Sequence, residues 1–192
     1  MQGMKQAVRS WHYGFFVLGI GLLAVVTRLF PHPPNFAPMT ALALFSGVAF
    51  RNRWVGIGYV LGLMFLSDVL LELAFGFGFH SGMPVVYGSL LLIALLGGTL
   101  RKRFHFLAIT GMTLLSSVLF FILTNLGVWL FSGMYPHTLD GLVLCYTLAI
   151  PFFHNALAGD IVYAALLFGS YAYALAHFPA LQASPNAVRF AH

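Results

Sequence analysis

The sequence predicts an all-α integral membrane protein with six transmembrane helices and both termini in the cytoplasm. Of its 192 residues, 60% are hydrophobic and 7% are charged, and its mean hydropathy is +0.92. Average soluble domains carry about 25% charged residues, so lipid has to be the solvent for much of this surface. We expect residues 1–192 to form a single transmembrane domain, with cytoplasmic tails at residues 1–10 and 177–192.

The positions of the basic residues predict the orientation. Eight of the nine Lys and Arg residues lie at the chain ends or in alternate breaks between apolar runs, and Arg28 alone lies in an intervening break. Basic loops stay in the cytoplasm because translocating them is costly. We therefore expect a multi-pass protein of the inner membrane, with three loops outside. The eight residues are Lys5, Arg9, Arg51, Arg53, Arg101, Lys102, Arg103 and Arg189.

The net charge of +5 follows from this topology and also suits anionic inner-leaflet lipids. No basic stripe is interleaved with exposed aromatic residues, so nucleic acid is not an expected partner. The expected partners are the lipid bilayer and a small molecule. A single cysteine, Cys145, excludes an internal disulfide.

Six apolar runs carry the predicted helices, and a perpendicular span needs about 20 residues. The first run follows two basic residues but continues without a small-residue cleavage site, which favours an uncleaved helix over a signal peptide. The second has only 15 residues and opens with Pro38, so we expect it to start below the outer surface and to leave a pocket above it. The runs are Trp11–Phe30, Phe36–Phe50, Trp54–Leu73, Pro84–Leu100, Phe104–Phe131 and Leu142–Ala176.

The last two runs are longer than one span. The fifth has 28 residues and is expected to tilt or to project beyond the bilayer. The sixth has 35 residues and contains Pro151, which predicts a break. We expect an outer cap over Leu142–Ile150 and a span that begins at Phe152.

Two carboxylates share one face of the third predicted helix. Asp68 and Glu72 are four residues apart, near the outer end. An ionisable group costs about 2.5–3.5 kcal/mol at the centre of a span and usually faces a cavity or a partner. Asp68 is therefore expected in a polar network or ligand site, with Arg28 as one partner, whereas Glu72 could equally end the helix at the interface.

Two predicted outer loops carry further candidates. Four prolines between residues 31 and 38 hold His32 and Asn35 in an extended arrangement, which suits either a ligand clamp or a rigid connector. Residues 75–79 alternate Phe and Gly before His80, so the strip could close over a hydrophobic ligand or belong to an interfacial aromatic belt. Tyr87 lies one turn into the next helix and could point back toward this loop.

Other groups leave their roles open. His80, His137 and Cys145 could each ligate a metal, but no pair has the helical spacing of a zinc site. On the sixth run, His154, Asn155 and Asp160 could serve helix packing or ligand contact. No catalytic Ser-His-Asp spacing, phosphate-binding glycine loop or Gly-x-Ser-x-Gly elbow occurs, so an enzyme is not expected.

Several segments together resemble a known membrane family. The segments are Pro31–Pro38, Ser67–Asp68, Phe79–Tyr87, Thr124–Trp129, Tyr135–Pro136, Cys145–Tyr146 and Pro151–Phe153. The chain is similar, over about Arg28 to Phe168, to the six-helix substrate-binding (S) components of energy-coupling-factor (ECF) vitamin transporters. The nearest branch is that of solitary homologues, which includes cobalamin transporters.

The resemblance implies a vitamin or cofactor uptake protein with both ends cytoplasmic and a pocket roofed by the first, third and fifth loops. It implies substrate binding by a set of five residues. They are His32, Asn35, Asp68, His80 and Tyr87. The best substrate expectation is cobalamin, as a transported ligand rather than a tightly required cofactor.

Two departures from the family qualify this expectation. Some cobalamin-handling members offer an outer-loop thiol to cobalt, whereas here His80 is the candidate metal ligand and Cys145 the less favoured one. Small residues on the first helix, at 14, 19, 21 and 24, are never four apart from one another, so the close-packing face that docks the ECF ATPase module is missing. We expect a solitary transporter. A metal-ion or small organic-cation carrier, or a membrane-embedded enzyme, are the alternatives.

Overall fold

The computed structural model describes the backbone of residues 2–188 and the side chains of residues 11–188. This part of the chain is all-helical and contains no strand. The helices are α1 (Gln2–Thr27), α2 (Met39–Ala49), α3 (Arg53–Phe75), α4 (Met83–Leu100), α5 (Phe106–Phe131), α6 (Leu139–His177) and α7 (Pro179–Gln182). Four of them, α3 to α6, are long and apolar enough to cross a membrane, and the apolar parts of α1 and α2 are shorter. The prediction of an all-α membrane protein is confirmed to this extent.

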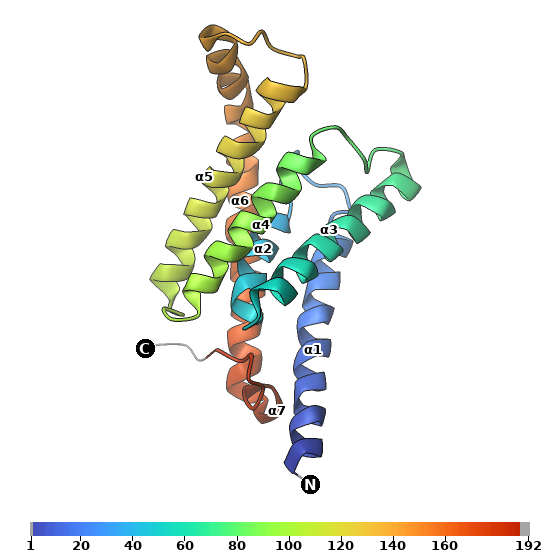
Figure 1. Cartoon of the computed structure of the whole chain (residues 1–192), viewed down its shortest axis with the longest axis vertical. Coiled ribbons are helices and arrows are strands. Elements are labelled where there is room, and N and C mark those ends of the chain that lie inside the picture. Colours follow the sequence, from blue (N-terminus) through green and yellow to red (C-terminus); the bar gives the residue numbers. More distant parts are fainter. Residues whose placement is uncertain (1, 189–192) are drawn as a thin grey trace.

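The short helix α2 lies at the centre of the bundle (Figure 1) and is buried over its whole length. It packs against α3, α4, α5 and α6. Glycines allow its closest approach, because a Cβ atom on Gly47 would overlap the carbonyl oxygen of Ala94, and one on Gly97 would overlap that of Leu44. The backbones of α2 and α4 therefore touch directly, as small residues permit in membrane helices.

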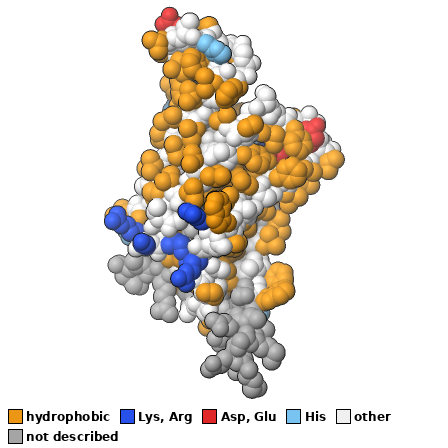
Figure 2. Space-filling model, in the orientation of Figure 1, with side chains coloured by type: hydrophobic (Ala, Val, Ile, Leu, Met, Phe, Trp, Pro, Cys, Tyr) orange, Lys and Arg blue, Asp and Glu red, His pale blue; other side chains and the backbone are white. Residues whose placement is uncertain are grey.

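The two ends of the molecule differ in what they carry. Figure 1 shows the start of α1 and α7 at one end, here the lower end, and the α1–α2, α3–α4 and α5–α6 connections at the upper end. α5 and α6 extend upward past the other helices, as expected for runs longer than one span. Figure 2 shows Lys and Arg side chains gathered over the lower part of the visible face, and acidic side chains at the top and at the upper right.

The predicted break at Pro151 is wrong. α6 runs without interruption from Leu139 to His177, with Pro151 inside it, and Leu142–Ile150 is not a separate cap. Proline removes one backbone hydrogen bond, which neighbouring helices can compensate in a membrane protein. Here α5 supports both sides of the proline. Tyr146 Oη donates to the Ile122 carbonyl at 2.7 Å, and Phe153 packs on Phe121 with centroids 4.7 Å apart.

The residues of the two predicted tails, 1–10 and 177–192, contain helical backbone where the structure describes them. The backbone is helical from Gln2, and the chain after His177 folds back through α7 to residue 188. Asn186 anchors this segment, because its carbonyl accepts from Arg101 Nη2 at 3.2 Å and its side chain accepts from the Arg51 N–H at 3.0 Å. The side chains of Lys5 and Arg9, and all of Arg189, lie outside the described residues.

Candidate functional site

A cavity of about 370 Å³ lies in the upper half of the bundle, between α2, α3, α4, α5 and α6. Small-molecule sites are typically apolar clefts of about 300–1,000 Å³ with a few polar groups that orient the ligand. The apolar walls are formed by Ala37, Met39, Met64, Val86, Phe120, Phe121, Val128, Ala149, Phe152, Phe153 and Ala156. The polar groups come from Arg28, Asn35, Thr40, His80, Ser117, Thr124, Asn125 and Asp160.

Asp160 supplies a carboxylate to this cavity from α6. Its side chain is only 3% exposed, and Ser117 Oγ donates a hydrogen bond to Oδ2 at 2.7 Å. The Thr40 hydroxyl and the Ala41 N–H also bond to this carboxylate. All three donors are neutral groups.

The sequence places Asp160 at the start of α2 by a close backbone approach. A Cβ atom on Gly159 would lie 3.2 Å from the Ala37 nitrogen, so α6 passes tightly against the segment that enters α2. Pro38 at the N-cap provides no side-chain cap, which leaves N–H groups of the first turn of α2 without an intrahelical partner. A carboxylate satisfies such groups and interacts favourably with the helix dipole.

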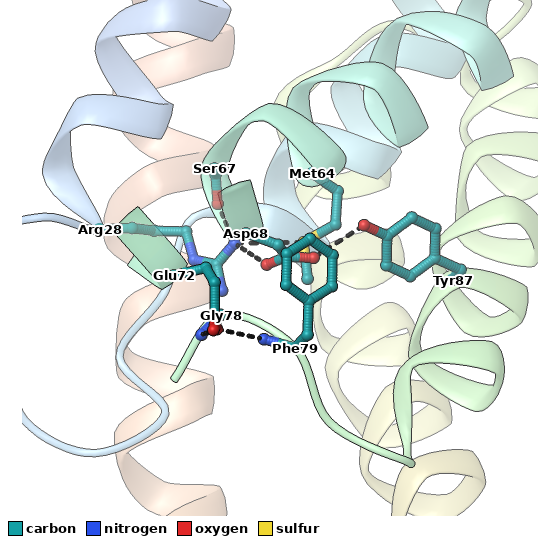
Figure 3. A network of polar contacts seen from close by, with 8 residues as sticks. All are labelled: Arg28, Met64, Ser67, Asp68, Glu72, Gly78, Phe79 and Tyr87. Atoms are coloured by element: carbon teal, nitrogen blue, oxygen red, sulfur yellow. Dashed lines mark hydrogen bonds and ion pairs between the residues drawn. The ribbon is translucent and has the colours of Figure 1, made fainter. Parts of the chain in front are cut away.

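A second carboxylate, Asp68, is bound on both of its oxygens (Figure 3). Arg28 Nη1 lies 3.0 Å from Oδ1, and the Tyr87 hydroxyl donates to Oδ2 at 2.7 Å. The same guanidinium nitrogen donates to Ser67 Oγ and to Met64 Sδ, the latter at 3.3 Å. Asp68 is only 2% exposed and does not line the cavity, whereas Arg28 and Met64 do. The predicted pairing of Arg28 with Asp68 is confirmed, and it stiffens the cavity wall.

Glu72 holds the α3–α4 loop against α3. Its Oε2 accepts from the N–H groups of Gly78 and Phe79, at 2.8 and 3.3 Å (Figure 3). Gly76 ends α3 with a φ of 73°, a left-handed conformation suited to glycine, and a Cβ atom on Gly78 would overlap the Asp68 carbonyl oxygen. The loop therefore folds back on the last turns of α3 and brings His80 to the cavity.

The phenylalanines of this loop do not line the cavity. Phe75 and Phe77 stack on each other with centroids 5.6 Å apart, and Phe79 contacts Phe65 on α3. All three loop rings are exposed. This arrangement favours the aromatic-belt interpretation over a strip that closes on a ligand.

The five predicted substrate-binding residues divide among three environments. Asn35 and His80 line the cavity. Asn35 has a φ of 65°, a left-handed conformation that asparagine tolerates better than most residues. His32 is exposed, and its Nδ1 lies 3.0 Å from the Pro33 carbonyl oxygen. Asp68 and Tyr87 reach the cavity only through Arg28.

The candidate metal ligands do not converge. Cys145 is buried, and its Sγ lies 3.5 Å from the Asn125 carbonyl oxygen rather than in the cavity. His137 packs on Trp129 in the α5–α6 loop, and no residue of that loop lines the cavity. Among the described residues, no group of three or more His, Cys, Asp or Glu side chains could hold a metal ion. His80 is the histidine that the cavity offers to a ligand.

Sequence reasoning left Asp160 undecided and did not single out Thr40, Ser117 or Asn125. Asp160 is the one acidic residue within the apolar run from Leu142 to Ala176. An ionisable group inside a span usually faces a cavity or a partner. The presence of a single acidic residue in this run was therefore the sequence signal that could have identified Asp160 as a site residue. Its hydroxyl partners come from other helices and carry no local signature.

Comparisons with known proteins place the chain in a family without an assigned activity. No curated protein and no solved structure matches it. The resemblance to ECF S components therefore stays a prediction. A family profile matches residues 9–181, nearly the whole chain. The chain belongs to the family of unknown function DUF6580.

Proposed function

We propose that this protein is a substrate-binding membrane transporter for uptake of a vitamin-sized compound, similar to a solitary ECF S component. The observation that carries the proposal is the cavity of about 370 Å³ enclosed by five helices, with polar groups from two loops and from α6. Such a combination of apolar walls and few convergent polar groups is typical of small-molecule sites.

Charge supports an outward-facing cavity. Five basic residues lie around the α2–α3 and α4–α5 connections, away from the cavity. They are Arg51, Arg53, Arg101, Lys102 and Arg103. If these connections are cytoplasmic, as the positive-inside rule favours, the cavity opens to the side from which a nutrient arrives. The proposed topology has six spans and both termini inside, and α2, at 11 residues, crosses only part of the bilayer.

The lining predicts the class of ligand. The lining includes four aromatic rings, of Phe120, Phe121, Phe152 and Phe153, and the Asp160 carboxyl group, which accepts hydrogen bonds. A compound with an aromatic or heterocyclic ring and an amino or other donor group satisfies both. A corrinoid is larger than a cavity of about 370 Å³, so cobalamin uptake requires the α1–α2 and α3–α4 loops to open.

One observation favours a second candidate, a small organic-cation carrier. Among described residues, the Asp160 carboxylate has hydrogen-bond partners but no ion-pair partner, so a cationic ligand could serve as its counter-charge. Transport assays separate the candidates, because a cation carrier would accept quaternary ammonium compounds that lack a ring system.

Mass spectrometry of the compound that co-purifies with the protein tests the proposal. His80→Ala removes a lining group and is expected to lower occupancy about tenfold, the loss for one polar contact worth about 1.4 kcal/mol. His32→Ala is the matched control, since that imidazole is also exposed on a loop but lies outside the cavity. Equal loss in both variants, or no bound compound and no binding of any vitamin tested, would contradict the proposal.

Cobalamin can be tested directly. Binding through an imidazole should perturb the visible spectrum of the corrinoid, and His80→Ala should abolish the change. His105→Ala, which alters the N-cap of α5 at the lower end, should leave it intact. An unchanged spectrum with the wild-type protein would remove a His80–cobalt bond.

A further inference from the structure

A second and larger cavity lies at the lower end of the molecule. Its volume is about 830 Å³, and it is bounded by α2, α4, α5 and the α2–α3 and α4–α5 connections. Five of the nine basic residues of the chain line it. They are Arg51, Arg53, Arg101, Lys102 and Arg103. Topology explains basic residues on this side of the protein, but it does not explain their convergence on one cavity.

Among the described residues, no carboxylate lines the cavity beside these cations. The chain contains four acidic residues, and none lines the cavity. Among described residues, the ion pair of the structure is Arg28–Asp68, at the other end. Arg101 donates to the carbonyl oxygens of Val48 and Asn186, which are neutral. Like charges gathered without counter-charge repel one another, so an anion bound among them is stabilised.

The cavity also has an apolar wall. Ala94, Leu95, Ala108, Gly111 and Met112 form it along α4 and α5. Leu95 is partly exposed on the outer surface of α4, so this wall continues toward the face that meets lipid. A free phosphate ion would use only the cationic part, whereas a phospholipid would use both.

A tryptophan beside the cavity indicates where the cavity lies relative to the lipid headgroups. Trp54 is 65% exposed, and the Arg53 guanidinium lies 5.1 Å from its ring centroid. Exposed tryptophans of membrane proteins sit at the level of the lipid headgroups. The cations therefore lie where a phospholipid carries its phosphate.

We propose that this lower cavity is a binding site for an anionic phospholipid, with its phosphate held by the five basic side chains and an acyl chain along the α4–α5 wall. Basic pockets between membrane helices bind anionic headgroups in this way. The inference goes beyond the uptake function and does not depend on which compound the upper cavity takes.

Native mass spectrometry of the delipidated full chain, titrated with phosphatidylglycerol, phosphatidylcholine or inorganic phosphate, tests this. Phosphatidylglycerol should bind at least about tenfold more tightly than phosphatidylcholine. Lys102→Gln combined with Arg103→Gln should remove that preference, while Lys102→Arg combined with Arg103→Lys should keep it. Equal binding of phosphatidylglycerol and phosphatidylcholine by the wild-type protein would overturn the proposal. Full displacement of the lipid by millimolar phosphate would also overturn it, because that result indicates a small-anion site.

A substitution that leaves the net charge unchanged distinguishes a specific lipid-binding site from a general attraction of anionic lipids to the basic residues. Gly111 lines the cavity, and a Cβ atom there meets nothing within 4 Å, so Gly111→Leu should fold and fill the apolar wall. It should weaken phosphatidylglycerol binding about tenfold without altering net charge. Gly62→Leu on α3 is the matched control, because a Cβ atom there also meets nothing within 4 Å and Gly62 does not line the cavity. Equal binding by both variants would overturn the site.

Discussion

The two most deeply buried carboxylates, Asp68 and Asp160, are almost equally hidden but are neutralised differently. Asp68 faces a guanidinium at 3.0 Å and a phenol at 2.7 Å, so both of its oxygens are occupied and its charge is balanced. Asp160 is held by the Ser117 hydroxyl and by neutral donors at the start of α2. Only Asp160 lines the upper cavity.

This difference indicates that the two residues have different roles. A carboxylate that is already paired stabilises the arrangement of the helices it joins, and removing its partner leaves a buried charge. A carboxylate bonded only by neutral groups has no counter-charge among the described residues, so a ligand can provide one. We therefore expect Asp68 to govern stability and Asp160 to govern binding, which reverses the emphasis that the sequence placed on Asp68.

The largest expected effect is on stability at Asp68. Asp68→Asn leaves Arg28 without its counter-charge in a largely buried position, which costs about 3–5 kcal/mol for a buried pair. The unfolding midpoint in detergent should fall accordingly. The double variant Arg28→Met with Asp68→Leu should recover most of the loss, since it removes both charges together. A midpoint unchanged in Asp68→Asn would show that the pair contributes nothing to stability.

Asp160→Asn is expected to affect binding more than folding. An amide retains one acceptor oxygen for Ser117 or for the α2 N–H groups, but the cavity loses the one carboxyl group, among the described residues that line it, that could pair with a ligand. A hydrogen bond to a charged group contributes about 1.5–3 kcal/mol, so binding of the co-purified compound should weaken by at least about tenfold. Titration of the purified variant measures this, and its unfolding midpoint should fall less than that of Asp68→Asn. If Asp160→Asn lowered the unfolding midpoint more than Asp68→Asn, Asp160 rather than Asp68 would be the carboxylate that governs stability.

Much of the fold could be predicted from the sequence, because apolar runs and basic breaks are local signals. The positions of α1 to α5 follow the first five runs within a few residues at most ends, and the short second run is the buried α2. The continuity of α6 could not be read, because its support at Pro151 comes from Ile122 and Phe121 on another helix.

The candidate site was harder to predict from the sequence, because it too depends on contacts between distant parts of the chain. The Arg28–Asp68 pair was foreseeable, since a buried carboxylate needs a cation and few cations were available. The placement of Asp160 depends on Gly159 passing against residues 36 and 37, which are more than 120 positions away in the chain. Which of His32 and Asn35 turns toward the cavity depends on backbone geometry within a loop, including the left-handed φ of Asn35.

Tyr87→Phe sharpens the account of Asp68. It removes the hydroxyl that donates to Oδ2 and leaves the ion pair with Arg28 intact. Side-chain hydrogen bonds between membrane helices contribute about 1–2 kcal/mol at most in typical measurements, so destabilisation should lie in that range and below that of Asp68→Asn. The unfolding midpoint measures it. Tyr163→Phe on α6 is a matched control, because its ring packs on Phe36 and its hydroxyl makes no hydrogen bond to Asp68. A loss as large as that of Asp68→Asn would mean that the phenol, rather than the cation, stabilises the carboxylate.

The smallest expected effect concerns Ser117, which tests the other half of the comparison. Ser117→Ala removes one of the neutral donors to Asp160, while Thr40 and Ala41 continue to bond to the carboxylate. The loss in unfolding free energy should be near the average of about 0.6 kcal/mol for an interhelical hydrogen bond in a membrane protein. Ser116→Ala is the matched control on the same helix, since its buried Oγ has no hydrogen-bond partner among described residues and its removal should be neutral or slightly stabilising. If Ser117→Ala were instead as damaging as Asp68→Asn, Asp160 would depend on this one hydroxyl, and its carboxyl group would stabilise the helix packing rather than bind a ligand.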